Sequence, residues 1–346
     1  MTADSTVPGI EDVAGLARWL NANGVPAAAE LPSVELIAGG RSNLTYRLEF
    51  PGPAGPVRLV LRRPPLGHVL PTAHDMSREY RVISALHGTA IPVAGPVAFC
   101  ADTEVIGAPF YVMEYVDGVV LRTTAQAGLV SPEQARGVSE RLAEMLAAIH
   151  AVDLAAAGLT DFGRPAGYMQ RQWHLSATRE VPGYTDLVRR LADGLPSDGE
   201  GTLVHGDFRV DNVLITLPRP RITAVVDWEM ATLGDPLADV GLTLVYWADP
   251  ADTDWVEAEV GANITAAPGF GTRAEFAARY AAHSGRDLSH VGYYMAFGCF
   301  KLAVVLEGIN ARFLQNKTVG EGFHREGRAV PMLIKRAHRM LETGGV

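Results

Sequence analysis

The sequence has few cysteines and no excess of positive charge. Only Cys100 and Cys299 occur among its 346 residues, which excludes a disulfide framework and a thiolate cage for a metal ion. Its 30 basic residues stand against 39 acidic ones, a formal net charge of −9. Because duplex nucleic acid is bound through a cationic surface, this balance argues against a nucleic-acid partner.

The chain also shows no sign of a secretory or membrane segment. Its first residues, MTADSTVPGI, lack the basic start and the apolar stretch of a signal peptide. The most apolar region, VGYYMAFGCFKLAVVLEGI, is interrupted by Lys301 and Glu307, which favours a buried helix over a membrane span. We expect a cytoplasmic protein with no membrane partner and no evident protein partner.

The chain contains 48% hydrophobic residues, enough to form a sizeable hydrophobic core. Its length favours two lobes over one. Residues 1–115 read as a small, strand-rich lobe with one important helix. The predicted strands lie in VELIAGGRSNLTYRLEF, VRLVLRR, VAFC and PFYVMEYV, and the helix is expected from Ala73 to Leu86, before Gly88.

Residues 116–346 read as mostly helical. Ser131 and Pro132 form a typical helix start before an apolar face that includes Val138 and Leu142. The exception is one predicted strand pair, VLI and ITAVVDW, joined by the proline-containing turn TLPRP. The sequence thus predicts an α+β protein with a small antiparallel-sheet lobe and a larger helical lobe.

One polar stretch, HGDFRVDN from His205 to Asn212, sits between two apolar runs. Polar groups at the edge of a core cost free energy unless they have partners or a purpose. If the run that follows, VLI, forms a hairpin with the AVV run that precedes Asp227, Asn212 at the start of one strand lies beside Asp227 at the end of the other. These two residues would offer hard oxygen ligands for Mg²⁺, with Asp207 just off that edge and able to accept a proton. Each motif alone is more often a capped turn, so their combination carries the prediction.

Two further features lie in the first lobe. Glu79 falls within the helical arc of Met76, Ile83 and Leu86, so its carboxylate is expected to be buried beside a cation, Arg62 or Arg63, or to lie at the helix edge. GGRSNLTY, from Gly39 to Tyr46, is a glycine-rich turn whose backbone N–H groups could approach a phosphate, although most such turns are ordinary hairpins.

With these motifs in place, the sequence resembles the aminoglycoside phosphotransferase/choline kinase-like family, which has the bilobal protein-kinase-like fold. HGDFRVDN matches the pattern H-G-D-x-x-x-x-N, and VVDWEMATLGDPLADVG carries the metal-binding aspartate. Four segments most resemble the subgroup that is fused to acyl-CoA dehydrogenase domains: VLRRPP, REYRVISAL, GAPFYVMEYVDG and GDPLADVG.

The resemblance implies an ATP- and Mg²⁺-dependent kinase acting on a hydroxyl of a small molecule. Asp207 would be the catalytic base and Arg209 would approach the transferred phosphate, while His205 and Asp239 would brace the loop. The resemblance assigns Mg²⁺ to Asn212 and Asp227. It assigns the nucleotide to the first lobe, at Gly39, Gly40, Ser42, Asn43, Arg62, Glu79, Glu114 and Val116.

The sequence departs from the family at two positions. Arg62 occupies the place of the usual strand lysine, which changes the geometry at the phosphates, although arginine keeps the charge. DWE, from Asp227 to Glu229, replaces the more usual Asp-x-Gly, which predicts a stiffer segment after the metal ligand.

Three functions stay open at this point. The leading one is the small-molecule kinase, whose acceptor could be an antibiotic, a hydroxyacyl-CoA or another metabolic alcohol. The second, motivated by Arg62, is a nucleotide-binding pseudokinase that acts as a sensor or scaffold. A metal-dependent hydrolase ranks last, because one histidine among hard oxygen ligands makes a poor zinc site.

Overall fold

The computed structural model describes residues 7–37, 43–52, 55–66, 75–165, 167–196, 201–249, 263–315 and 326–344. Contacts between Cα atoms divide the chain into two compact units, Met1–Val116 and Asp117–Val346. The predicted phosphate-binding residues Gly39, Gly40 and Ser42 lie outside the described residues. Most of the acidic stretch ADPADTDWVEAEV, residues 248–260, also lies outside the described residues.

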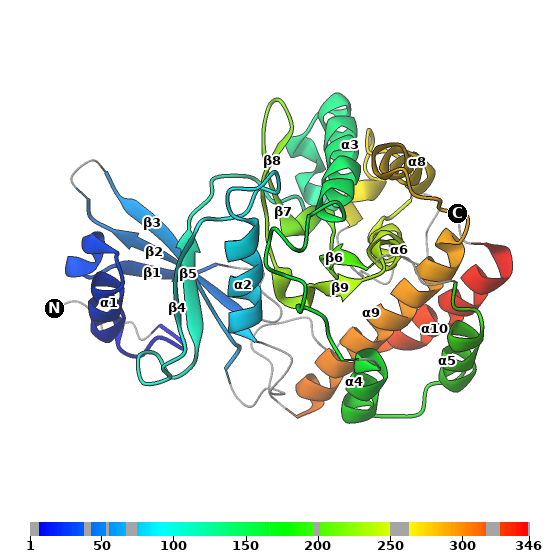
Figure 1. Ribbon diagram of the computed structural model, residues 1–346, viewed down its shortest axis with the longest axis horizontal. Helices are drawn as coiled ribbons and strands as arrows, with labels where there is room; N and C mark the ends of the chain where they lie inside the picture. Colours follow the sequence, from blue (N-terminus) through cyan, green and yellow to red (C-terminus); the bar gives the residue numbers. More distant parts are fainter. Residues whose placement is uncertain are drawn as a thin grey trace. The chain divides into compact units, whose positions relative to one another are not determined.

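The smaller unit is built on a five-stranded antiparallel sheet with the order β1-β2-β3-β5-β4 (Figure 1). Its strands are β1 (Ser33–Leu36), β2 (Leu44–Phe50), β3 (Val57–Arg63), β4 (Pro96–Cys100) and β5 (Phe110–Glu114). Alternation along β2 places Tyr46, Leu48 and Phe50 in the core, as the sequence predicts. The predicted antiparallel sheet is therefore confirmed.

Two helices cover this sheet, one on each face. The predicted helix is α2 (Met76–Leu86), which is capped by Asp75 and buries Glu79 together with Val82 and Ile83. The second, α1 (Val13–Ala22), packs Leu16 and Leu20 against the other face, and a short 3₁₀ helix, η1 (Pro26–Ala29), follows it. Helix α1 was not among the predicted elements.

The larger unit is mostly helical, as predicted. Its helices are α3 (Pro132–Ile149), α4 (Tyr168–Ser176), α5 (Tyr184–Asp193), α6 (Pro236–Tyr246), α8 (Arg273–Ser284), α9 (Val291–Leu314) and α10 (Glu326–Thr343). Short 3₁₀ turns are η2 (Thr124–Leu129), η3 (Val210–Asn212), η4 (Trp228–Met230) and η5 (Asn263–Ala266). Ser131 caps α3 and forms a capping box with Gln134.

Two small strand pairs carry the polar loop. The predicted hairpin is β7 (Val213–Thr216) with β8 (Arg221–Val225), and Val213 lies opposite Val225. A second pair, β6 (Thr202–Val204) with β9 (Thr232–Gly234), shows that the prediction of a single strand pair was wrong. A three-residue strand is too short to show a period-2 pattern, so β9 has no signature in the sequence.

The long apolar region forms α9, which packs against α6 and α10 (Figure 1). By length and composition it could cross a membrane, and 67% of its most apolar window is buried inside the structure. It crosses α6 closely at two glycines, since a Cβ on Gly241 would lie 2.3 Å from the Tyr294 carbonyl carbon and one on Gly298 would lie 2.9 Å from Leu242 Cα. This close crossing brings α9 beside the polar loop.

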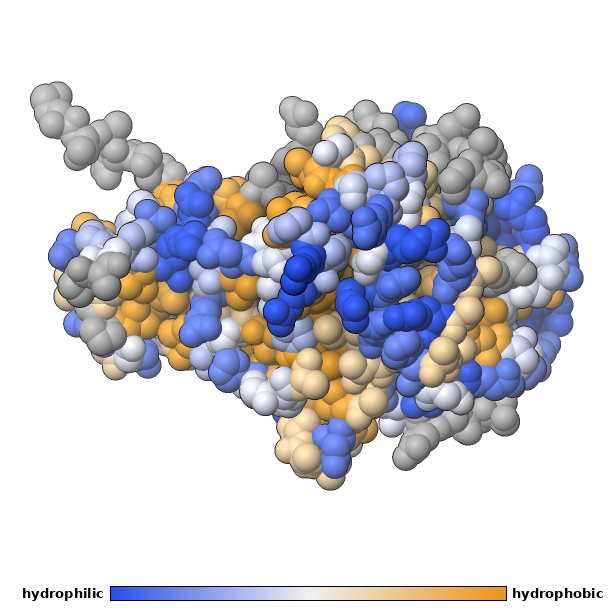
Figure 2. Space-filling model, turned by 90° about the horizontal axis from the view of Figure 1, so that it is seen from above, coloured by the Kyte–Doolittle hydropathy of each residue, from blue (hydrophilic) through white to orange (hydrophobic). Residues whose placement is uncertain are grey.

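The outer faces of α3 and α8 carry charged pairs. Arg136 lies 3.3 Å from Glu275, and Arg279 binds the carboxylate of Glu144. Figure 2, which looks down from the side where α3 and α8 lie uppermost in Figure 1, shows hydrophilic residues gathered over this part of the larger unit. These charged pairs form a solvated face of the larger unit.

Candidate active site

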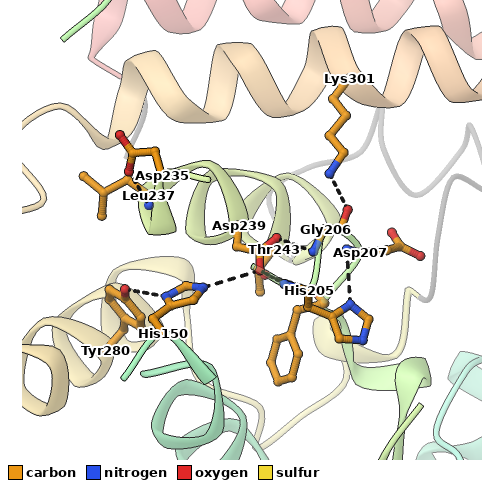
Figure 3. Close-up of polar contacts among 11 residues, drawn as sticks. His150, His205, Gly206, Asp207, Asp235, Leu237, Asp239, Thr243, Tyr280 and Lys301 are labelled. Atoms are coloured by element: carbon orange, nitrogen blue, oxygen red, sulfur yellow. Dashed lines mark hydrogen bonds and ion pairs between the residues drawn. The ribbon is translucent and has the colours of Figure 1, made fainter. Parts of the chain in front are cut away.

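The loop from His205 to Asn212 follows β6 directly and is held by its own backbone. Gly206 has φ +82°, and a Cβ there would lie 2.4 Å from the Met230 carbonyl oxygen, so only glycine fits. Its N–H donates to Asp239 Oδ1 at 2.7 Å, and its carbonyl accepts from Lys301 Nζ (Figure 3). Both polar groups of this peptide are therefore satisfied inside the protein.

Asp239, in the first turn of α6, is the anchor of the loop. Its Oδ2 accepts from the His205 backbone N–H at 2.5 Å and lies 3.4 Å from His150 Nε2. Burial raises the pKa of this carboxyl, but the hydrogen bond and charge of His150 and the charge of Lys301 outweigh it and hold the pKa below its ordinary value. The predicted position of Asp239 beneath the loop matches this geometry.

His205 links the loop to the strand end that precedes Asp227. Its Nδ1 accepts from the Asp207 N–H at 3.2 Å, so Nε2 carries the proton that is donated to the Val226 carbonyl at 3.0 Å. Burial lowers the pKa of His205, although the charges of Asp239 and Asp207 oppose that shift. The ring is neutral and structural, and it packs 4.5 Å from the ring of Trp228.

Asp207 points away from these anchors (Figure 3) and is bound to Asn212. The Asn212 Nδ2 donates to the Asp207 carbonyl at 2.8 Å and to its Oδ2 at 3.1 Å. Burial raises the pKa of Asp207, and the charges of Asp227 and Asp211 raise it further, while Arg209 lowers it. A carboxylate whose pKa is raised in this way is a better proton acceptor than one in water.

Asp227 lies at the end of the hairpin beside Asn212, as predicted. The Asn212 carbonyl accepts from the Val226 N–H at 3.0 Å, one residue before Asp227. Asp227 is the one non-glycine residue with positive φ in the described part of the chain, at φ 66° and ψ 55°. Such backbone strain concentrates at functional sites. The buried Trp228 that follows donates to the Val225 carbonyl at 3.0 Å and fixes this turn.

Arg209 is held among carboxylates rather than extended into solvent. Its Nη2 lies 2.9 Å from Asp211, its Nε lies 3.7 Å from Asp207 Oδ2, and its guanidinium covers the ring of Tyr246 at 4.8 Å. Arg209 and Tyr246 also line a small pocket with Val210, Thr243, Trp247 and Thr265.

In the smaller unit, Arg62 and Glu79 form the ion pair that the sequence suggested. Arg62 Nη2 lies 3.2 Å from Glu79 Oε1, and both side chains are buried. The neighbouring Arg63 faces the opposite side of the sheet, where it donates to the Ile106 carbonyl at 2.9 Å. Asn43 is buried, and Glu114, whose side chain is exposed, donates its N–H to the Gly95 carbonyl at 2.8 Å. Val116 is the last residue of this unit.

Several residues that hold the site were not predicted. His150, whose Nδ1 lies 2.7 Å from the Tyr280 hydroxyl, supports Asp239, and Thr243 donates to the Phe208 carbonyl at 2.8 Å. The sequence did offer a signal for Lys301, because a lysine within an apolar helix is buried only if its charge has a partner. Glu307, the other interruption, has a packing role, since it accepts from the Thr178 N–H at 3.0 Å.

Replacing Gly206 by alanine is expected to lower the free energy of unfolding by about 2–4 kcal/mol and to lower the melting temperature by several degrees, because positive φ is combined with a backbone overlap. Thermal denaturation would measure the shift. Gly128→Ala is the matched control, because a Cβ there meets nothing within 4 Å and its φ is not positive. Equal shifts in the two variants would contradict the close packing at Gly206.

Removing Glu79 is expected to destabilise the protein by about 3 kcal/mol in the Glu79→Ala variant, because Arg62 then stays buried without its carboxylate. The double variant Arg62→Met with Glu79→Met should recover much of that loss. Arg189→Ala breaks a solvent-exposed pair with Asp186 and should cost less than about 1 kcal/mol. Urea unfolding would compare them, and a Glu79→Ala effect no larger than that of Arg189→Ala would contradict the buried pair.

The antiparallel sheet unit, the helical unit and the H-G-D-x-x-x-x-N loop together define a kinase-like phosphotransferase. The chain belongs to the phosphotransferase enzyme family, whose family profile matches residues 33–276. The predicted fold class and the family resemblance are both confirmed.

Curated relatives include acyl-CoA dehydrogenase family members, the subgroup that the sequence resembles. Acyl-CoA dehydrogenase family member 10 of Mus musculus is 32% identical over 306 residues, which are 86% of this chain and 28% of the relative. Family member 11 of Rattus norvegicus is 34% identical over 292 residues, 82% of this chain and 37% of the relative. The chain thus spans well under half the length of these relatives.

Solved structures show the same fold. A Ralstonia eutropha protein provisionally described as an aminoglycoside phosphotransferase is 30% identical, with a TM-score of 0.75 over 96% of this chain and 98% of that one. An aminoglycoside phosphotransferase in a ternary complex with AMP-PNP and hygromycin B has a TM-score of 0.59, with 16% identity over 95% of this chain and 98% of that one. At that identity the likeness concerns the fold alone.

Proposed function

We propose that the protein transfers the γ-phosphate of ATP to a hydroxyl group of a small molecule. The observation that carries this proposal is the grouping of Asp207, Asn212 and Asp227. Asn212 binds Asp207 directly, and Asp227 follows the residue that is hydrogen-bonded to Asn212. The loop is held rigidly through Asp239, His205 and Lys301, which suits a reaction that depends on positioning.

The donors at this site fit Mg²⁺. The Nδ2 of Asn212 donates to Asp207, and within the described residues no hydrogen bond is found to the Asn212 Oδ1. Asp227 adds a carboxylate whose charge acts on neighbouring Asp207. Two hard oxygen donors suit an ion that keeps several waters and shares substrate phosphates. The described residues contain no cluster of three or more histidine, cysteine, aspartate or glutamate side chains that could hold a metal alone.

The protein's own residues would act as follows. Asp207 orients the acceptor hydroxyl and accepts its proton as the oxygen bonds to the γ-phosphorus and the bond to the ADP oxygen breaks. Asn212 holds the Asp207 carboxylate in place, and Asn212 and Asp227 would hold Mg²⁺. The metal ion, when bound, offsets the charge on the phosphate oxygens.

In the smaller unit, we assign the nucleotide to the glycine-rich turn at Gly39, Gly40, Ser42 and Asn43, to the Arg62–Glu79 pair, and to the backbone at Glu114 and Val116. The support is the buried ion pair at 3.2 Å, which presents a fixed guanidinium in place of the usual lysine. A solved structure of the same fold contains AMP-PNP, which supports nucleotide binding by this fold.

Arg209 is assigned to the transferred phosphate. It lies beside Asp207 and is fixed by Asp211 and Tyr246, so its charge is placed without further ordering. Arg209→Ala is expected to lower turnover at least about tenfold while leaving the fold intact. Unchanged turnover, measured as ADP formation, would remove this role.

For the acceptor, the acyl-CoA dehydrogenase relatives favour a hydroxylated acyl group or another metabolic alcohol over an antibiotic. The second candidate function is a nucleotide-binding pseudokinase, which the replacement of lysine by Arg62 favours. It predicts ATP binding with no transfer to any hydroxyl.

A metabolite screen tests the two functions. Purified protein with ATP and Mg²⁺ is mixed with fractions of a cell extract, and ATP consumption is compared between wild type and Asp207→Asn. We expect one or more fractions to stimulate the wild type alone. ATP binding by calorimetry with no fraction that stimulates turnover would favour the pseudokinase.

A further inference from the structure

One side of α9 is a half-buried stripe that runs past the active-site loop. Lys301, Val305, Gly308 and Arg312 recur every three or four residues, so they lie on one face of this helix. All four are half-buried, whereas most of the helix is fully buried. Lys301 donates to the Gly206 carbonyl next to Asp207 (Figure 3), and Arg312 lies eleven residues away, about 16 Å along the axis.

A second arginine reaches the same region from the loop before α4. Arg164 Nη2 donates to the Glu229 carbonyl at 2.8 Å, two residues after Asp227, and its guanidinium covers the ring of Tyr168 at 4.7 Å. Within the described chain, Arg164 Nε is a buried donor that has no hydrogen-bond partner. A buried N–H without an acceptor suggests that a ligand supplies one.

Lys301 and Arg164 influence one another, and Arg312 lies near the carboxylate of Glu229. Burial lowers the pKa of Lys301 and the charge of Arg164 lowers it further, although Asp239 and Asp207 oppose the shift. Burial also lowers the pKa of Arg312, against the charge of Glu229. Like charges gathered at a partly buried surface are unfavourable, and an anion bound among them would relieve that cost.

We propose that Arg164, Lys301 and Arg312 form a basic strip that binds an anionic group of the acceptor. This inference rests on the proposed function and specifies its substrate class: the acceptor is a hydroxylated molecule that also carries a carboxylate or a phosphate. Its apolar part would lie along Val305 and Gly308, and its hydroxyl would lie at Asp207. A cationic acceptor would be repelled by this strip.

Binding of simple amphiphiles tests the strip without any turnover. Isothermal titration calorimetry would compare octanoate, octyl phosphate and octylammonium on the wild type, on the double variant Arg164→Gln with Arg312→Gln, and on Arg189→Gln. Arg189 is an exposed arginine of α5 and serves as the matched control. We expect at least one anion to bind the wild type and Arg189→Gln, with at least a tenfold loss in the double variant, while octylammonium binds none of them.

The two anions distinguish a carboxylate site from a phosphate site. The proposal would be overturned if the double variant bound each anion as tightly as the wild type does. It would also be overturned if the wild type bound octylammonium more tightly than either anion. Circular dichroism would show that the double variant is folded. A second double variant, Arg164→Gln with Arg312→Lys, should recover part of the affinity, because lysine keeps the charge at position 312.

A transfer assay separates failure of this inference from failure of the proposed function. ATP consumption is measured with ω-hydroxyoctanoate and with its neutral amide. Preference for the acid that disappears in the double variant supports both proposals. If neither compound nor any extract fraction is phosphorylated, the proposed function fails, whereas equal use of acid and amide by an active enzyme overturns the strip alone.

Discussion

Asp207→Asn is expected to lower turnover about a thousandfold while leaving the fold and the affinity for nucleotide nearly unchanged. Asparagine has the same shape, and its side-chain oxygen can still accept from Asn212 Nδ2, which donates to Asp207 Oδ2 at 3.1 Å. What it loses is the ability to take a proton from the acceptor hydroxyl. Initial rates of ADP formation and calorimetric titration with AMP-PNP would measure the two quantities.

The control for this substitution is Asp186→Asn, which changes an exposed carboxylate on α5 and should leave turnover unchanged. Turnover by Asp207→Asn within about threefold of the wild type would show that Asp207 does not act as the base. An equal loss of nucleotide affinity would instead assign it a binding role.

The second large effect is expected at Asp239. Its two oxygens accept the His205 and Gly206 N–H groups, at 2.5 and 2.7 Å, so Asp239→Asn must turn an amide donor toward one of these donors. We expect a loss of about 3 kcal/mol in the free energy of unfolding. Turnover should also fall, about a hundredfold, because the loop that carries Asp207 is no longer held in position.

The effect of Asp239 should depend on pH. The folded protein holds the pKa of this carboxyl below its value in the unfolded chain. Its contribution to stability is therefore fully present above about pH 4 and is lost as the pH falls through the lower, folded pKa. Urea unfolding of wild type and Asp239→Asn should show curves that differ at pH 7 and approach each other in acid. A difference that is constant with pH would contradict this role.

Much of the fold could be predicted because local patterns determine it. Alternation along β2 and the helical spacing of α2 identify elements and buried faces directly, and the arc of α2 predicted the burial of Glu79. The hairpin of β7 and β8 was predicted from its apolar runs and its turn. By contrast, β9 is three residues long, and α1 was not recognised although Asp12 caps it by accepting from the Gly15 N–H.

The candidate site divides in the same way. Asp207, Asn212 and Asp227 belong to one loop and one hairpin, so their proximity follows from strand pairing. The groups that hold the loop come from distant helices, such as His150 on α3 and Lys301 on α9, and their contacts depend on helix packing. No periodic pattern encodes such contacts, although a charge within an apolar helix signals that one exists.

A double-mutant cycle in turnover between Asp207→Asn and Asp227→Asn tests most directly whether these residues act as one phosphoryl-transfer site. Each single substitution is expected to lower ADP formation about a thousandfold. The double variant should lose at most about a further tenfold relative to the slower single variant, because the effects of residues that act as a unit are not additive. An Asp227→Asn variant with wild-type turnover, or losses that multiply fully in the double variant, would contradict the shared site.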